Sequence, residues 1–516
     1  MVILLVTGQL ASKLVEEQAR KCNKPVKVVV LNFPVASLMK PAYILREVKP
    51  HITPDVECIM VPGLVRGDVS IIEKNLGIKV VKGPKHAYDI PLIINNFNIG
   101  DLSKEIPADE LIKERLKKFV ENEISKIEHD SEIANKEGNY EIRGLKYGID
   151  FPVRIVAEIV DAPELSLNEL KMKALYYADS GANIIDIGMV ASENNADKVK
   201  KIIEALGEVT NLPLSIDSME AEEINEAIKA GIDMVISLDL SLLDKVMVKE
   251  HVHYVVVPID LSTSYFPKFH EERVELLEKI IFNARKKGYK NLIADVILDP
   301  PFSKSFIDSL VAYRILRQRN PNLPILIGTG NITELIDADT PGMNALLTMM
   351  AYELRASFIL STEVSDKCRG VIKELSIASK MGFVSRLKNT YPKGIGYDLL
   401  ILRDKKLKDE IPEEESAQVI YAEGNEGYYV QDPKGWFKIY IDRNKQEILV
   451  HYKASYRDAK TTLIIKGKNP SAIYRKISEL GLISKIDHAA YLGAELQKAY
   501  IALKLGKSYV QDSDLF

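Results

Sequence analysis

Eight short apolar runs between residues 150 and 380 place the strongest constraint on the fold of this 516-residue chain. Segments with a helical apolar period lie between most of these runs, so strands and helices alternate. Each run is nearly continuously apolar, which is typical of a parallel strand buried on both faces. Their number and lengths favour a (β/α)₈ TIM-type barrel over an open sheet. The predicted strands are Arg154–Val160, Asn183–Ile187, Pro213–Ile216, Met234–Leu238, Tyr254–Ile259, Leu292–Leu298, Pro324–Ile327 and Ser357–Leu360.

The chain on either side of this region has different patterns. Residues 1–145 alternate short apolar runs with helical segments, which predicts a small Rossmann-like α/β domain. Residues 386–516 carry strands joined by turns and then two helical segments, which predicts an α+β domain. We therefore predict three domains, with the barrel at residues 146–385. The outer domains contain the predicted strands Val2–Thr7, Val26–Leu31, Cys58–Val61, Ile78–Val81, Tyr428–Val430, Trp436–Ile441 and Glu447–Tyr452, and the predicted helices Ser471–Gly481 and Ala489–Gly506.

Charge and cysteine content narrow the possible functions. The net charge is −4, from 69 basic and 73 acidic residues, which gives no electrostatic case for binding nucleic acid or an anionic membrane. Cys22, Cys58 and Cys368 lie far apart in the sequence, so neither a zinc site nor a disulfide framework is predicted. A reducing compartment, the cytoplasm, is expected. No apolar run reaches the roughly 18 residues that a membrane span needs.

Polar acceptors follow nearly every predicted strand of the barrel. Barrel enzymes work at the carboxyl ends of their strands, so these side chains are expected around one opening. They are Glu158 and Asp161, Asp186, Asp217, Ser237 and Asp239, Asp260, Asp299, Thr329 and Asn331, and Thr362 and Glu363. An Asp in this position often caps the next helix, and that interpretation stays open for each one.

A ring of carboxylates suggests two kinds of ligand. A divalent metal would be bound by oxygen atoms, but neither His251 nor His253 lies at a predicted strand end, and no metal site is predicted. The alternative is a neutral heterocycle rich in N–H donors, because a carboxylate accepts two parallel hydrogen bonds. The amino-pyrimidinone edge of a pterin presents such a pair of donors.

Four segments resemble the pterin-binding superfamily, which unites dihydropteroate synthases with methyltetrahydrofolate-type corrinoid methyltransferases. SGANIIDIG at residues 180–188 is similar to the second-strand motif of the synthases. LSIDS at 214–218, AGIDMVIS at 230–237 and ILDP at 297–300 resemble their third, fourth and sixth strands. The resemblance covers roughly residues 150–380, and the whole chain resembles an archaeal group of dihydropteroate synthase-related proteins.

The resemblance implies roles for several residues. Asp217 matches the family Asp that hydrogen-bonds the reduced pterin near N5, and Asp299 matches the Asp that holds the amino-pyrimidinone edge. Asp186 matches an Asp of the second strand near the mouth. Ser237 stands where the family usually has an Asn that contacts the ring, so this contact is expected to be shortened or lost.

The departures from the synthase pattern concern the cations that bind pyrophosphate. Synthases carry a Ser-Thr-Arg-Pro loop after the second strand, where this chain has MVASENN at residues 189–195. After the seventh strand they carry a basic residue that supports pterin and arylamine binding, where this chain has GTGNIT at 328–333. After the eighth strand they carry Arg and His, which help bind the leaving group, where this chain has LSTE at 360–363. A pyrophosphate leaving group needs cationic stabilisation. Lys304, Arg355 and Arg369 are the candidates to replace the missing cations.

The turn at residues 328–333 resembles the methyltransferase branch instead. That branch has a Gly-x-Ser-Asn-x-Ser turn whose Asn is positioned to hydrogen-bond near N5, and Asn331 falls on that Asn. Loss of a methyl group from N5 is helped by a positioned proton or hydrogen-bond donor. Asp217 and Asn331 are therefore the predicted catalytic residues, and the alternative for Asn331 is a turn or cap residue.

Two features of the outer domains are candidate binding sites. Arg66 lies in a loop that leads from a strand into a helix, where backbone N–H groups and the guanidinium group are able to bind an anion; a plain structural turn is the alternative. His488 opens a predicted helix, but it lacks the Asp-x-His-x-x-Gly spacing of corrinoid ligands, which favours a packed histidine over a cobalt ligand.

The function expected from these residues is transferase chemistry on a reduced pterin of the tetrahydromethanopterin or folate type. A dihydropteroate synthase-like protein would join a pterin-CH₂ unit to an arylamine, with Mg²⁺ a candidate ligand. An N5-methyl-pterin methyltransferase would need a corrinoid, free or on a partner protein, and the residues after the seventh and eighth strands favour this alternative. A non-catalytic pterin carrier or scaffold is the third hypothesis, and a homodimer is left open.

Overall fold

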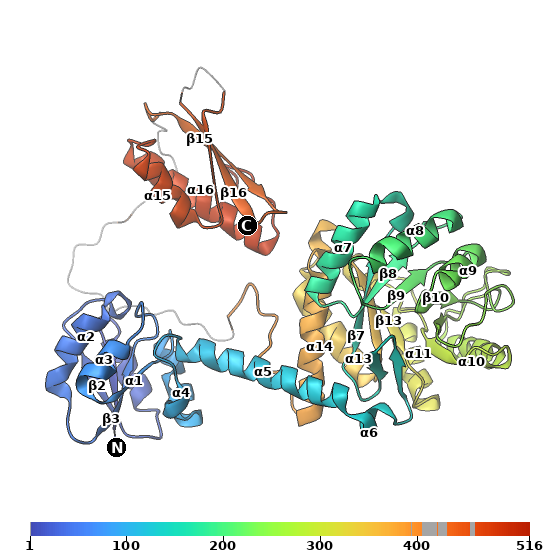
Figure 1. Cartoon of the computed structure of the whole chain (residues 1–516), viewed down its shortest axis with the longest axis horizontal. Coiled ribbons are helices and arrows are strands. Elements are labelled where there is room, and N and C mark those ends of the chain that lie inside the picture. The colour runs from blue at the N-terminus through green and yellow to red at the C-terminus, as the bar shows by residue number, and fades with distance from the viewer. Residues whose placement is uncertain (1, 394, 405–420, 422–430, 455–459) are drawn as a thin grey trace. The chain divides into compact units, whose positions relative to one another are not determined.

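The computed structural model describes residues 2–393, 395–404, 421, 431–454 and 460–516 (Figure 1). The chain forms two compact units, residues 1–410 and residues 411–516. The first unit contains a four-stranded parallel sheet and an eight-stranded parallel barrel, and the second contains a three-stranded antiparallel sheet. The domain boundaries at residues 145/146 and 385/386 remain predictions. Among the described residues, no helix has the length and apolar character that crossing a membrane requires.

The N-terminal sheet follows the predicted strands and is covered on both faces. Its strand order is β2-β1-β3-β4, with all neighbours parallel. Alternate residues of β1 point to opposite faces, so Ile3 and Leu5 join one core and Leu4 and Val6 join the other. Helices α1 and α4 cover the first core, and α2 and α3 cover the second. The bounds are β1 Val2–Thr7, α1 Ser12–Ala19, β2 Val26–Val30, α2 Pro41–Val48, β3 Val56–Val61, α3 Ser70–Leu76, β4 Lys79–Lys82, α4 Ile90–Asn96 and α5 Ala108–His129.

The central region is the predicted barrel. Eight parallel strands are ordered β12-β11-β10-β9-β8-β7-β14-β13, and a parallel bridge between Ala294 and Ile325 links the two edges. Each strand lies within a few residues of its predicted position. The strands are β7 Arg154–Ile159, β8 Ile184–Gly188, β9 Leu214–Asp217, β10 Met234–Leu238, β11 His253–Val256, β12 Asn291–Ala294, β13 Leu326–Gly328 and β14 Phe358–Thr362.

Helices surround the barrel, and local sequence explains where they begin and end. At the start of α7, Ser166 and Glu169 form a capping box, and Gly181 ends the helix with φ +95°. The chain between β10 and β11 turns without a regular helix. The outer helices are α7 Leu167–Ser180, α8 Ala196–Gly207, α9 Ala221–Lys229, α10 His270–Lys286, α11 Phe306–Arg319, α12 Gly330–Thr333, α13 Thr340–Glu353 and α14 Val371–Lys388.

A hairpin closes the amino end of the barrel. After the short helix α6 (Ser131–Ala134), β5 (Asn139–Ile142) and β6 (Leu145–Gly148) pair antiparallel. The buried Tyr147 packs on Phe358 at 4.6 Å between ring centroids, and its hydroxyl lies 2.7 Å from Nδ1 of His253. Both residues stand at the amino ends of their strands. The sequence predicted no strand between Val81 and Arg154, so this hairpin is an addition to the expected fold.

The C-terminal unit is α+β, as predicted. Strands β15 (Trp436–Asp442) and β16 (Glu447–Lys453) alternate buried with more exposed residues, and β17 (Leu463–Gly467) extends the sheet. Helices α15 (Pro470–Glu479) and α16 (Ile486–Leu505) cover the buried face. The sequence did not predict β17. The predicted strand Tyr428–Val430 lies outside the described residues.

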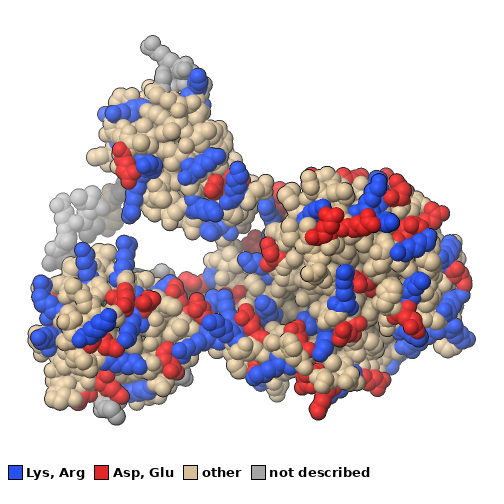
Figure 2. Space-filling view, viewed as in Figure 1, with Lys and Arg blue, Asp and Glu red and all other residues tan. Residues whose placement is uncertain are grey.

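Acidic and basic side chains are interspersed on the face seen in Figure 2. Both signs occur over the barrel and over the outer units, which agrees with the near balance of 69 basic and 73 acidic residues. The view shows no broad area of one sign among the described residues on that face.

Candidate functional site

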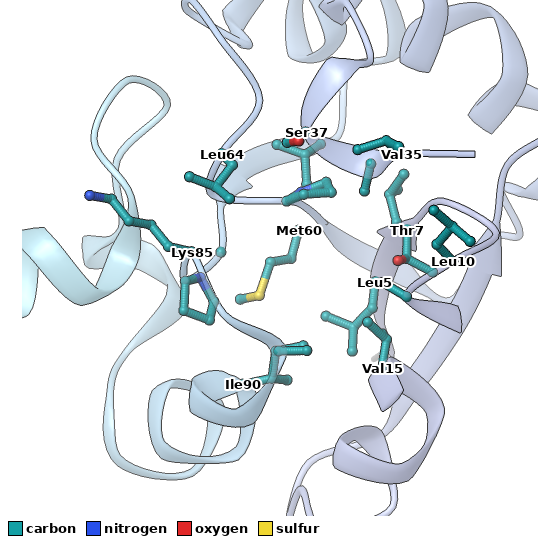
Figure 3. A pocket seen from close by; sticks show the side chains of 18 residues that line it. Leu5, Thr7, Leu10, Val15, Val35, Ser37, Met60, Leu64, Lys85 and Ile90 are labelled. Atoms are coloured by element: carbon teal, nitrogen blue, oxygen red, sulfur yellow. The ribbon is translucent and has the colours of Figure 1, made fainter. Parts of the chain in front are cut away.

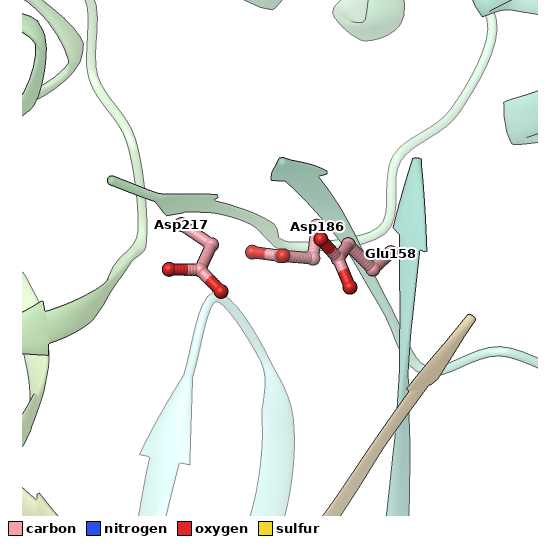
Figure 4. A group of neighbouring side chains, drawn as sticks. All are labelled: Glu158, Asp186 and Asp217. Carbon is pink, nitrogen blue, oxygen red and sulfur yellow. The ribbon is translucent and has the colours of Figure 1, made fainter. Parts of the chain in front are cut away.

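Three carboxyl groups meet at the carboxyl ends of β7, β8 and β9. Glu158, Asp186 and Asp217 each bring a carboxylate oxygen within 4.8 Å of the others (Figure 4). They meet because neighbouring parallel strands end at the same edge of the barrel. Gly188 makes the room, since a Cβ there would lie 2.5 Å from Oε1 of Glu158. We call these three residues the carboxyl cluster.

Asp186 lies at the centre of the cluster and is fully buried. The hydroxyl of Ser215, on β9, donates a 2.5 Å hydrogen bond to Oδ1 of Asp186. The other oxygen, Oδ2, is buried and has no hydrogen-bond partner among the described residues. Buried polar atoms nearly always have partners. An oxygen of this kind at a barrel mouth is where a donor from a ligand is expected.

The cluster is held towards its neutral forms. Burial, with the adjacent Asp161, raises the pKa of Glu158 to about 7. Burial, followed by the charges of Glu158 and Asp295, raises the pKa of Asp217 to about 8. The pKa of Asp186 is raised well above its usual range by burial first and then by Asp217 and Glu158. Near neutral pH the cluster therefore retains protons and is able to donate hydrogen bonds as well as accept them.

Asp295 is a fourth carboxyl group near the cluster, and the sequence analysis missed it. It follows β12 directly, is almost completely buried, and accepts hydrogen bonds from the hydroxyl of Tyr313 at 2.5 Å and from the backbone N–H of Ile297 at 2.7 Å. Burial raises the pKa of Asp295 to about 6, although these hydrogen bonds act in the opposite direction. The predicted strand Leu292–Leu298 extends four residues past Ala294, where β12 ends. Asp295 therefore fell inside the predicted strand and was not recognised as an acceptor at a strand end.

Asp299 lies beyond the end of β12 and is held by buried partners. The fully buried guanidinium group of Arg273, on α10, forms an ion pair with its Oδ2, and the hydroxyl of Ser305 donates to the same oxygen at 2.6 Å. Arg273 also donates to the carbonyls of Pro267 and Ile297, both at 2.9 Å. Asp299 therefore fixes the loop after β12, whatever it binds in addition.

Asn331 and Ser237 stand at other strand ends. Asn331 is exposed on α12, and its Nδ2 donates to the carbonyl of Leu298 at 3.0 Å, which ties the loops after β12 and β13 together. Ser237 is buried on β10. The structure thus puts Asn331 next to the Asp299 loop.

Other predicted acceptors hold loops. Oδ1 of Asp239 accepts from the backbone N–H of Leu242, and Oδ2 from that of Leu261. Asp260 accepts from the hydroxyl of Ser262 at 2.5 Å. The predicted ring of acceptors therefore converges only in part.

The candidate cations do not gather at one site but lie in separate loops of the first unit. Arg355 lies just before the amino end of β14, and Lys304 is exposed in the loop after β12. Arg369 follows β14 and, with Lys173 of α7, lines a polar cavity of about 180 Å³. Its wall includes Tyr176, whose hydroxyl donates to Oε2 of Glu363 at 3.0 Å. Arg66 is exposed in the loop between β3 and α3 of the N-terminal sheet.

Two cofactors can be tested against the residues present. Carboxylate oxygens are the ligands Mg²⁺ prefers, so the carboxyl cluster fits that ion, and it is the one such group of three among the described residues. His488 does not fit a corrinoid ligand, because it is buried, packs on the Phe437 ring at 5.5 Å between centroids, and lies 3.3 Å from Oδ2 of Asp432. The packed histidine was the favoured interpretation of the sequence.

Comparison with known proteins adds to this geometry. The pterin binding enzyme family matches residues 162–349, a family of unknown function matches residues 1–85, and the model PterinBD-DUF4346 matches residues 431–512. An uncharacterized protein of Methanocaldococcus jannaschii is 40% identical over 529 aligned positions, which cover 100% of this chain and 99% of that protein. The chain belongs to the family of this archaeal protein, and its barrel to the pterin-binding superfamily.

Dihydropteroate synthases are among the proteins similar to the barrel region. The enzyme of Clostridium beijerinckii is 30% identical over 166 residues, which are 29% of this chain and 61% of that enzyme. The solved Yersinia pestis synthase with a pterine-sulfa conjugate is 17% identical, with a TM-score of 0.39, and covers 48% of this chain and 99% of that one. The Xanthomonas albilineans synthase with 7,8-dihydropteroate is 18% identical, with a TM-score of 0.36, and covers 48% and 98%.

Proposed function

We propose that the pterin-binding barrel takes a reduced pterin of the tetrahydromethanopterin or folate type and transfers the methyl group from its N5 to a nucleophilic acceptor. The observation that carries this proposal is the Asp217 carboxyl group, whose pKa is raised to about 8 in the mouth of the barrel. A carboxylic acid that keeps its proton near neutral pH is the donor that cleavage of an N5–methyl bond needs.

Each residue of the site has a separate role in the proposed methyl transfer. Asp217 gives its proton to N5, and the electron pair of the N5–methyl bond stays on that nitrogen as the methyl group moves to the acceptor. Asn331 supplies an amide donor from α12. Asp299 holds the amino-pyrimidinone edge, with Asp186 and Ser237 against the ring. Asp186 contributes Oδ2, the buried oxygen that has no partner among the described residues.

The methyl acceptor has to be a nucleophile that reaches the mouth of the barrel. A corrinoid accepts a methyl cation equivalent, and it would be brought free or by another protein, because the packed His488 does not offer cobalt a ligand. Mg²⁺, if present, would be held by the carboxyl cluster and would compete with its protons.

A pteroate-type condensation is the second candidate. The cavity beside β14 supports it, because Lys173 and Arg369 line that cavity and would offer positive charge to a pyrophosphate leaving group, although Glu363 and Asp366 line the same cavity and offset this charge. The raised pKa values of the carboxyl cluster count against it, since they indicate that negative charge is already unfavourable in the mouth. The carrier hypothesis requires pterin binding and neither reaction.

Calorimetry and two assays on one preparation test the proposal. Calorimetry with a panel of reduced pterins comes first, and no heat from any of them with folded protein would refute pterin binding. Methyl transfer from an N5-methyl pterin to a free or protein-bound corrinoid is then compared with condensation of a pterin-CH₂ pyrophosphate and an arylamine. We expect methyl transfer to dominate. Asp217→Asn should slow it by about 100-fold, the lower end of the usual range for acid catalysis, and Asn331→Ala by about tenfold, because the amide is an auxiliary hydrogen-bond donor.

The pH profile separates acid catalysis from structural damage. The rate of the wild-type protein should fall as the pH rises through about 8, because Asp217 then loses its proton. Asp217→Asn should bind pterin with little change and lose this pH dependence. Efficient condensation that Asn331→Ala leaves unchanged and Arg369→Ala abolishes would favour the synthase reaction. Pterin binding with neither reaction would favour the carrier.

A further inference from the structure

A second cavity lies in the N-terminal sheet, at the carboxyl ends of β1 and β3. The connection after β1 leads to α1 on one face of the sheet, and the connection after β3 leads to α3 on the other face. The sheet order β2-β1-β3-β4 makes this the point where the connections change direction. Open parallel sheets bind their ligands in the crevice at such a point.

The cavity is mostly apolar and of a definite size. It measures about 230 Å³, and side chains of Leu5, Val15, Met60 and Ile90 line it (Figure 3). A cavity of about 150 Å³ with similar walls is large enough for benzene. The strand ends approach closely here, because a Cβ at Gly63 would lie 2.5 Å from the carbonyl oxygen of Gly83. The backbone therefore shapes one wall.

The charges around the cavity argue against an anion. Lys85 is the one charged residue that lines it among those described, and its ammonium group pairs with Glu110 and points away from Met60 (Figure 3). Arg66, the predicted anion-binding residue, is not part of the wall. Apart from Lys85, the polar side chains that line the cavity are the hydroxyl groups of Thr7 and Ser37. Among the described residues, Thr7 Oγ1 makes one long contact, 3.4 Å to the carbonyl of Gly8, and Ser37 lies across the cavity from Val15 and Ile90 (Figure 3).

We propose that this cavity binds an uncharged aromatic or heteroaromatic ring, of one or two fused cycles, carried by a small molecule. The thioether of Met60 reaches into the middle of the space (Figure 3), and sulfur makes favourable contacts with aromatic rings. The hydroxyl of Thr7, which lies beside Leu5 and Leu10, marks the place that receives a polar substituent, while the apolar walls take the ring (Figure 3). This site belongs to the N-terminal sheet and does not depend on the reaction proposed for the barrel.

The test uses the full chain with ¹³C-methyl methionine, in which the Met60 signal is assigned by its loss in Met60→Leu. Indole, 1-naphthol and naphthalene are the ring probes, and inorganic phosphate is the anion probe. We expect the rings to shift the Met60 signal and phosphate to leave it in place. Ala11→Phe fills the cavity from the start of α1 and should weaken indole binding by about tenfold or more. Glu17→Phe, at an exposed position of the same helix, should not.

A second variant protects the test if Ala11→Phe fails to fold. Thr7→Val keeps the shape of the side chain and removes its hydroxyl, so it should weaken 1-naphthol binding and leave naphthalene binding unchanged. The proposal is overturned if no ring shifts the Met60 signal, if phosphate shifts it instead, or if Thr7→Val affects both rings equally.

Discussion

The barrel mouth and the C-terminal unit each bury carboxyl groups, with opposite results. In the C-terminal unit, Asp432 is fully buried and accepts hydrogen bonds from the backbone N–H groups of Lys434, Ser484 and Lys485 and from the hydroxyl of Ser484, at 2.6–2.9 Å. Although burial alone would raise it, these donors hold the pKa of Asp432 below its usual range. Asp186 has one hydroxyl donor and one oxygen without a partner, and its pKa is raised.

This difference shows what makes a buried carboxyl group available to a ligand. Asp432 has all the donors it needs and serves to fix the loop before α16. Asp186 is equally buried but lacks donors, and its neighbours Glu158 and Asp217 are pushed towards neutrality with it. Burial is common to both, so the supply of donors decides between structure and binding.

The largest expected effect comes from Asp299, a carboxylate of the barrel that resembles Asp432. Asp299→Ala should lower the free energy of unfolding by about 3–5 kcal/mol, because it leaves the buried guanidinium group of Arg273 without its partner. Urea unfolding followed by far-ultraviolet circular dichroism measures this. The double variant Asp299→Ala with Arg273→Met should recover most of the loss. If the single variant costs less than about 1 kcal/mol, the ion pair with Arg273 does not stabilise the loop after β12, and the resemblance of Asp299 to Asp432 is refuted.

The same substitution in the two regions should have different results. Asp432→Asn turns an amide N–H₂ towards two donors whichever way it faces, because each carboxylate oxygen accepts two of these hydrogen bonds, and it should destabilise the C-terminal unit by about 3 kcal/mol. Fluorescence reports on this unit alone, because Trp436 is the single tryptophan of the chain. Asp186→Asn keeps an acceptor for Ser215 and removes a poorly solvated acid, so the barrel should lose less than about 1 kcal/mol or become more stable. Equal losses at both positions would contradict the comparison.

The smallest effect concerns pH. A carboxyl group whose pKa is higher in the folded state adds stability below its unfolded value and loses that contribution as the pH rises to its folded value. For Asp217 this window runs from about 4 to about 8. Asp217→Asn does not titrate, so relative to wild type it should gain stability across this window. Glu158 and Asp186 share the protons of the cluster, so the gain should be about 1 kcal/mol rather than the roughly 5 kcal/mol of an isolated group. Unfolding curves of both proteins at a series of pH values measure the difference. A constant difference would show that Asp217 titrates normally.

The barrel was predictable because its information is local. Each strand is marked by a nearly continuous apolar run, and each of the eight runs overlaps an observed strand. Asp186 and Asp217 were found because they end two such strands. Asp295 was missed because Val296 and Leu298 continue the apolar pattern after the chain has left the sheet, and both are buried outside any strand.

Partners that are distant in sequence were beyond prediction. Arg273 stands 26 residues before Asp299, and nothing local marks the pair. His488 and Asp432 are 56 residues apart. The hairpin of β5 and β6 was missed because its sequence is polar and short, and its one decisive side chain, Tyr147, is recognised only by its packing on Phe358 and His253. The N-terminal cavity likewise depends on strand order, which the alternation of elements does not determine.

The hairpin that closes the amino end has a consequence for molecular traffic. With Tyr147 packed against Phe358 and His253, the barrel is closed at its amino end. A molecule that reaches the buried Asp186 therefore enters and leaves through the opening at the carboxyl ends of the strands. In the transfer proposed for this site, the two reactants would have to bind in order, the deeper one first, and the deeper one would be released last. An analogue of the second reactant would then trap the first reactant in the barrel. It would slow release of the first reactant as well as binding of the second.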